Sequence, residues 1–119
     1  MTQAVLYNAF AYAFTNKPTY STSATSFIRK FFLDPKTGMN PQVRYGQVIR
    51  GPGDQDGQYL GILDFRGMVK VANAVRVLKA SGAKEWDSAT DKQLKDWASK
   101  YAAWLRTSVI GKKGNDAPK

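Results

Sequence analysis

A stretch rich in glycine and proline, residues 34–67, sets the strongest limit on how this chain can fold. It reads DPKTGMNPQVRYGQVIRGPGDQDGQYLGILDFRG and holds more than half of the glycines and three of the five prolines. Proline lacks an amide donor and glycine favours turns, so neither a long helix nor a regular strand is expected through the first half. Connections this long are uncommon in compact domains, and they are usually binding or active-site loops or disordered segments.

Apolar residues within this stretch favour an ordered loop over a disordered linker. They are Met39, Val43, Tyr45, Val48, Ile49, Tyr59, Leu60, Ile62 and Leu63. A solvated linker contains far fewer apolar side chains than this. We therefore predict an ordered loop over residues 34–63, which carries the functional site.

The hydrophobic periodicity on either side of the loop predicts four helices, over residues 2–14, 19–33, 64–81 and 91–108. Three of them have apolar stripes made of Leu6, Ala9, Phe10 and Ala13, of Ala24, Phe27, Ile28, Phe31 and Phe32, and of Met68, Val71, Ala72, Val75 and Leu78. Pro18 ends the first helix, and the short turn there predicts an antiparallel αα-hairpin. The expected fold is therefore all-α, built from αα-hairpins, with residues 111–119 as an exposed tail.

Several residues have the chemistry of helix ends. Asp64 is interpreted as an N-cap of the third helix and not as a catalytic acid. Thr90 and Gln93 form a capping-box pattern ahead of the fourth helix, and Gly82 is suited to the C′ position after the third.

The fourth helix carries the strongest amphipathic stripe of the chain. Its members are Leu94, Trp97, Tyr101, Trp104 and Leu105. Such a stripe indicates deep packing against a neighbouring element, and we interpret Trp97 and Trp104 as core residues. A platform for stacking carbohydrate rings is the alternative.

Composition narrows the classes of partner. The 119 residues form one small domain or a piece of a larger one, and the net charge of +9 favours nucleic acid, an acidic polysaccharide or an acidic membrane surface. The chain has neither cysteine nor histidine, which removes thiolate metal sites and the commonest general base. We predict neither a metal nor a cofactor, since the sequence shows no metal-ligand cluster. We also predict no membrane partner, because no apolar run is long enough to span a bilayer. The first residues also lack the pattern of a signal peptide.

Cations, amides and phenols alternate within the loop, and this mixture suits an acidic sugar chain. Arginine donates two parallel hydrogen bonds to a carboxylate, while amides and phenols bind hydroxyls and stack on rings. The predicted substrate-binding residues are Asn40, Arg44, Tyr45, Gln47, Tyr59 and Arg66, and Tyr45 and Tyr59 are the only candidates for catalysis. Each arginine, Arg50 included, has the alternative of being a solvated or structurally paired charge.

Three blocks in order resemble the alginate lyase domain of polysaccharide lyases, from about residue 5 to residue 114. They are FFLDPKTGMNPQVRYGQVIRG, GILDFRGMVKVANAVRVL and LKDWASKYAAWLRTSVIGKK. The resemblance implies part of an (α/α) toroid, and β-elimination of uronate-containing polysaccharide such as alginate or glucuronan, with residues 34–63 on the substrate side. It also implies a secreted or periplasmic location.

The catalytic Asn-His motif of that family comes after the helix that residues 91–108 resemble, and this chain contains no histidine. The resemblance therefore implies a partial lyase domain that is inactive alone. Its expected partners are an acidic polysaccharide and the remainder of the lyase domain beyond Lys119.

Two other functions fit the composition. One is a basic nucleic-acid-binding helical module, although the positive residues are scattered without a basic helix face. The other is a non-catalytic helical interaction scaffold.

Overall fold

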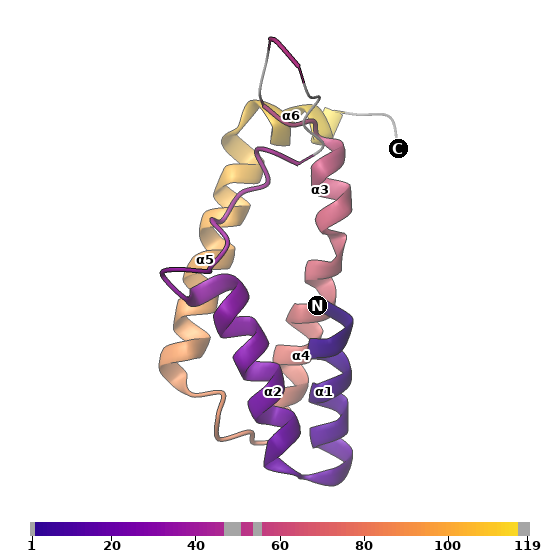
Figure 1. The fold of residues 1–119 in the computed structure, drawn as a ribbon, viewed down its shortest axis with the longest axis vertical. Helices are drawn as coiled ribbons and strands as arrows, with labels where there is room; N and C mark the ends of the chain where they lie inside the picture. Colours follow the sequence, from indigo (N-terminus) through magenta and orange to yellow (C-terminus); the bar gives the residue numbers. More distant parts are fainter. Residues whose placement is uncertain (1, 47–50, 54–55, 117–119) are drawn as a thin grey trace. The chain divides into compact units, whose positions relative to one another are not determined.

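The structure is a computed structural model that describes residues 2–46, 51–53 and 56–116. Its helices are α1 (Thr2–Thr15), α2 (Pro18–Ile28), the π-helix η1 (Arg29–Leu33), α3 (Leu60–Asp64), the 3₁₀ turn η2 (Phe65–Gly67), α4 (Met68–Ala80), α5 (Ser88–Thr107) and α6 (Val109–Asp116) (Figure 1). No strand occurs among the described residues, so the prediction of an all-α chain is confirmed.

The chain divides into two compact units, one of Met1–Met39 with Gly67–Lys95 and one of Asn40–Arg66 with Asp96–Lys119. In the first unit, α1 packs against both α2 and α4, and α1 and α2 form the predicted hairpin. The fully buried residues of this three-helix core are Val5, Ala9, Ser21, Ala24, Ile28, Val71, Ala74 and Leu78. Several of these side chains are small, which lets the helix axes approach closely.

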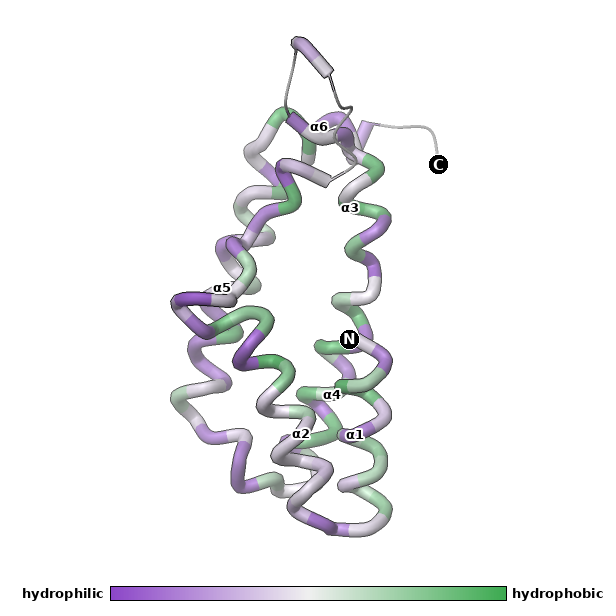
Figure 2. Tube along the Cα trace, viewed as in Figure 1, coloured by the Kyte–Doolittle hydropathy of each residue, from purple (hydrophilic) through white to green (hydrophobic). Residues whose placement is uncertain are grey.

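The buried face of α1 differs from the predicted stripe. In α1 the buried residues are Val5 and Ala9, whereas Phe10 is 42 % exposed. Apolar residues recur around most of α1 (Figure 2), so periodicity alone does not single out the packed face. The face that packs against α2 and α4 carries Val5 and Ala9.

The predicted stripe of the second helix is largely confirmed. Its members Ala24, Ile28 and Phe32 are buried, whereas Phe27 in α2 and Phe31 in η1 are partly exposed. In α4, Val71 and Leu78 are buried as predicted, but Ala72 is exposed and Ala74 is buried.

The second predicted helix changes its winding before it ends. The Asp34 N–H donates to the Arg29 carbonyl at 2.8 Å, a bond that spans five residues and closes the π-helical turn η1. This wider turn keeps Phe32 buried at 4 % exposure.

Gly82 stands at the C′ position after the C-terminal end of α4, as the sequence predicts. Gly82 has φ +69°, and its N–H donates to the Lys79 carbonyl at 3.2 Å. The Ala83 N–H donates to the Leu78 carbonyl at 3.0 Å, which completes a Schellman motif.

Two predicted helix starts are wrong. Asp64 does not cap the third helix, because it is the last residue of α3 and α4 begins only at Met68. Thr90 is not the N-cap of α5 either: the helix begins at Ser88, and the Thr90 N–H donates to Asp87 Oδ1 at 2.7 Å. Aspartate is as good an N-cap residue as threonine. Asp87, three positions before Thr90, accepts this hydrogen bond, and the helix therefore starts earlier than predicted.

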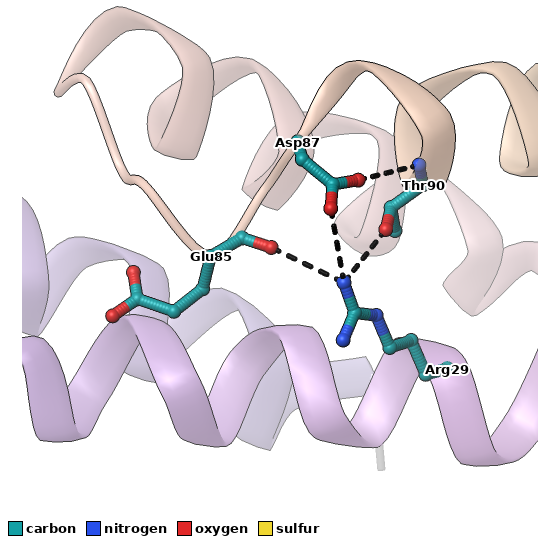
Figure 3. A network of polar contacts seen from close by, with 4 residues as sticks. All are labelled: Arg29, Glu85, Asp87 and Thr90. Atoms are coloured by element: carbon teal, nitrogen blue, oxygen red, sulfur yellow. Dashed lines mark hydrogen bonds and ion pairs between the residues drawn. The ribbon is translucent and has the colours of Figure 1, made fainter.

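A polar network connects the segment between α4 and α5, and the first turn of α5, with Arg29 of η1 (Figure 3). Arg29 Nη2 donates to Thr90 Oγ1 at 2.8 Å and to the Glu85 carbonyl at 3.4 Å, and it lies 3.7 Å from Asp87 Oδ2. On the other side, the Ser21 hydroxyl donates to Glu85 Oε2 at 2.7 Å. The network therefore joins this segment to the hairpin through hydrogen bonds as well as charge.

The stability of the first unit is expected to fall in acid, because folding lowers the pKa of three carboxyls. Hydrogen bonds lower each pKa: from Ser21 for Glu85, from the Thr90 N–H for Asp87, and from Lys95 for Asp91. A carboxyl with a lowered pKa stabilises the fold above its unfolded pKa, here 3.8 to 4.5, and this contribution disappears as the pH falls through the lower folded value.

Melting temperatures measured by circular dichroism between pH 7 and pH 3 test this expectation, with Glu85→Gln as the variant. The variant should lose less stability than the wild-type chain on acidification, since one of the three groups no longer titrates. Asp96→Asn removes an exposed carboxylate of α5 and is the control. Equal losses in the wild type and in Glu85→Gln would mean that the network does not contribute.

Candidate functional site

The long loop of the second unit is closed by backbone hydrogen bonds. The Gly57 N–H donates to the Arg44 carbonyl at 2.6 Å, and the Gln58 N–H donates to the Gly46 carbonyl at 2.9 Å. A Cβ atom on Gly57 would lie 2.6 Å from the Arg44 carbonyl oxygen, so only glycine permits this approach. The loop ends at Tyr59, because α3 begins at Leu60, earlier than the sequence predicts.

Arg44, Tyr45 and Asp56 form one cluster on this loop. Arg44 Nε donates to Asp56 Oδ1 at 2.7 Å, and the guanidinium carbon lies 5.4 Å from the centre of the Tyr45 ring. The Tyr45 side chain is 63 % exposed. Arg44 is thus held by a carboxylate, while Tyr45 presents a ring to solvent.

The other predicted site residues lie elsewhere or outside the described residues. Asn40 and Arg66 are exposed, the first at the start of the loop and the second in η2. Gln47 and Arg50 are outside the described residues. The structure therefore brings Arg44 and Tyr45 together, and places Tyr59 in a separate pocket.

That pocket is formed by α3, the end of α5 and α6. It has a volume of about 920 Å³ and is lined by Tyr59, Leu60, Ile62, Leu63, Leu105, Arg106, Gly111, Lys112, Gly114, Asn115 and Asp116. Leucine and isoleucine side chains supply its apolar wall, and Arg106 and Lys112 supply two positive charges. Among the described residues, no ion pair engages either of these two cations.

Helix α6 shapes the pocket. The sequence predicts an exposed tail from residue 111, and the structure shows that residues 111–116 are helical, with Gly111 buried and most of the other side chains exposed. Ser108 caps this helix by accepting a hydrogen bond from the Gly111 N–H at 2.9 Å. Gly111 is buried, and a Cβ there would lie 2.7 Å from the Leu105 carbonyl carbon. Glycine thus allows α6 to fold back closely onto the end of α5, whereas the side chains of Lys112 and Lys113 remain exposed.

Arg106 and Lys112 were not among the residues that the sequence singles out. Lys112 falls in a segment with two glycines, which reads as a tail because glycine weakens helices. The signal for this helix is Ser108, a capping residue that the prediction places at the end of the fourth helix and that follows the last residue of α5, Thr107.

A column of aromatic side chains stands in the same unit. Successive ring centres are 5.6 Å apart for Trp97 and Tyr101 and 6.1 Å apart for Tyr101 and Trp104, and Phe65 lies 5.4 Å from Tyr101. Burial raises the pKa of Tyr101 above its ordinary value. The core assignment is confirmed for Trp97, which is 6 % exposed, but Trp104 is only partly buried.

The described part of the chain has neither a metal-binding cluster nor a helix that could span a membrane. It contains no group of three or more His, Cys, Asp or Glu residues that could hold a metal ion. None of its helices combines the length and the apolar character needed to cross a membrane.

The fold has a counterpart among solved structures. The crystal structure of an alginate lyase from Bacteroides ovatus matches with a TM-score of 0.91 and 28 % sequence identity, over 98 % of this chain and 30 % of that chain. This chain therefore spans less than a third of the length of the solved lyase. The family model for alginate lyase matches residues 1–118, and the chain belongs to the alginate lyase family. No curated protein matches it.

These matches confirm the resemblance and the predicted fold class, an all-helical fragment of an (α/α) toroid.

Proposed function

We propose that this chain is the substrate-holding part of a lyase domain that cleaves uronate-containing polysaccharide, of the alginate or glucuronan type, by β-elimination. Membership of the alginate lyase family supports the reaction class. The observation that carries the substrate class is the pocket whose lining includes Tyr59 and two cations, Arg106 and Lys112, against the single carboxylate of Asp116. Cations pair with a sugar carboxylate, and the phenol ring can stack on the sugar face.

The chemistry of β-elimination explains why such cations matter. A base removes the C5 proton of a uronate, and the electrons of that C–H bond form the C4–C5 double bond as the C4–O bond breaks. Negative charge builds on the carboxylate in the transition state, and the departing oxygen takes a proton from an acid. Donors aimed at the carboxylate stabilise this charge, and a phenol is suited to the proton transfers.

In this proposal, residues of the loop and of η2 add further contacts with the polymer. Tyr45 presents its exposed ring, with Arg44 beside it, and Asn40 and Arg66 offer exposed donors. Gln47 is proposed as a contact on its residue type alone. We propose no catalytic residue in this chain alone; Tyr45 and Tyr59 are the candidates if residues 1–119 form product.

Binding of alginate and glucuronan to residues 1–119 tests the proposal, with the double variant Arg106→Gln/Lys112→Gln. Exposed ion pairs contribute about 0 to 1 kcal/mol each, so removing both cations should weaken binding by roughly five-fold. The affinity should also fall with added salt. Isothermal titration calorimetry measures both effects.

The matched control is Lys17→Gln/Lys36→Gln, which removes the same charge from exposed positions of the first unit. It should leave the affinity within about two-fold, since exposed charges away from a contact contribute little. Equal losses in the two double variants would show that net charge alone drives binding. Tighter binding of DNA than of polyuronate would favour the nucleic-acid alternative.

The proposal extends to the setting of the protein. We propose a secreted or periplasmic location, where polymeric uronates are found, and the remainder of an alginate lyase domain as the partner that completes the catalytic groups.

A further inference from the structure

One face of α1 is apolar and exposed. It carries Tyr7, Phe10 and Phe14, which are 65 %, 42 % and 84 % exposed, and the two phenylalanine rings stack with their centres 6.4 Å apart. Residues at i, i+3 and i+7 lie on the same side of a helix. We call this surface the outer face of α1; Val5 and Ala9 are buried within the first unit.

The composition of α1 indicates that its outer face is an interaction surface. The sequence TQAVLYNAFAYAFT contains no charged residue, and Figure 2 shows most of the helix in apolar or neutral colours. A helix that is apolar all round is typical of a buried position, with neighbours on more than one side. Contiguous exposed apolar patches on soluble proteins mark interaction sites.

A membrane surface and a second copy both fit this face poorly. Helices that lie in a membrane interface have a charged polar face rich in lysine and arginine, and α1 has neither residue. Two copies of a chain with a net charge of +9 repel one another, which opposes self-association.

The comparison with the solved alginate lyase indicates the occupant. The match covers 98 % of this chain but only 30 % of the chain of the solved lyase. Most of the solved lyase is therefore polypeptide that has no counterpart in residues 1–119. In a fold built from αα-hairpins, each pair of helices buries its open face against the next. We propose that the outer face of α1 is the interface for the remaining part of the alginate lyase fold, with Tyr7, Phe10 and Phe14 packed beneath a helical segment of that part.

This interface is independent of the substrate, so its test needs no activity. The probe is a chimera in which residues 1–119 replace the matching part of the Bacteroides ovatus alginate lyase. Phe14→Glu should lower the melting temperature of the chimera by about 5 °C or more, because it buries a charge. In residues 1–119 alone the same change should shift it by no more than about 2 °C, since Phe14 is exposed there. Ser26→Glu, an exposed position on α2, is the control with the same charge and should have small effects in both proteins.

A second variant keeps the test decisive if the first chimera folds poorly. Tyr7, Phe10 and Phe14 are replaced together by the residues that the Bacteroides ovatus lyase has at the matched positions. If the rest of the fold covers this face, the yield of folded chimera and its melting temperature should rise. No rise, or an equally small effect of Phe14→Glu in both proteins, would overturn the proposal. So would Phe14-dependent dimerisation of residues 1–119 in sedimentation velocity, or Phe14-dependent binding to phosphatidylglycerol vesicles.

Discussion

Replacing Trp97 with alanine is expected to lower the free energy of unfolding by about 3–5 kcal/mol, the usual cost of truncating a buried aromatic side chain. Trp97 is 6 % exposed, and its ring centre lies 5.6 Å from that of Tyr101 and 6.2 Å from that of Phe65. The variant loses apolar burial and two ring contacts, and it leaves a cavity. Urea denaturation followed by circular dichroism measures the change.

Trp104 provides the matched control within the same aromatic column. It is partly exposed, so Trp104→Ala should cost distinctly less, about 1–2 kcal/mol. Equal costs for the two variants, or a cost below about 1 kcal/mol for Trp97→Ala, would contradict the assignment of Trp97 to the core.

Residues 1–119 alone are expected to form no detectable unsaturated uronate from alginate or glucuronan. The chain contains no histidine, and the Asn-His motif of the family has no counterpart in it. A positioned general base contributes about 10²- to 10⁴-fold to the rate. Losing the family's histidine places turnover below detection, although the proposed donors to the substrate carboxylate, Arg106 and Lys112, lie within this chain.

The assay follows absorbance in the unsaturated-uronate band, with the Bacteroides ovatus alginate lyase as the positive control. Clear product formation by residues 1–119 would show that a base lies within this chain. Tyr45→Phe and Tyr59→Phe would then be compared, since each removes one candidate phenol. Loss of the product in one of them would identify that base.

The sequence predicts the larger helices well because their signals are local. Pro18 and Gly82 mark helix ends through their own backbone preferences, and both ends stand where the sequence places them. The packed faces are harder to predict, because Phe10 and Phe31 are as apolar as their buried neighbours. Which face is buried depends on how closely helices approach, which is a property of the tertiary structure.

The candidate site was predictable only in part. Tyr59 was identified by residue type, but the pocket around it depends on α6, a helix that glycine-rich sequence conceals. The pairing of Arg44 with Asp56 joins residues far apart in a loop, and no local pattern indicates it. No sequence pattern marks Arg106 as a pocket residue, because it follows the last residue of an apolar stripe and resembles an ordinary exposed helix residue.

The most direct test of the proposed substrate site is an NMR titration of residues 1–119 with a uronate oligosaccharide derived from alginate. Backbone amide shifts should change within residues 59–63 and 105–116, the segments that contain the lining of the pocket, and the changes should diminish in the Arg106→Gln/Lys112→Gln variant. Shifts confined to the first unit, or the same shifts produced by a DNA oligonucleotide of equal charge, would contradict the assignment of the pocket to an acidic sugar.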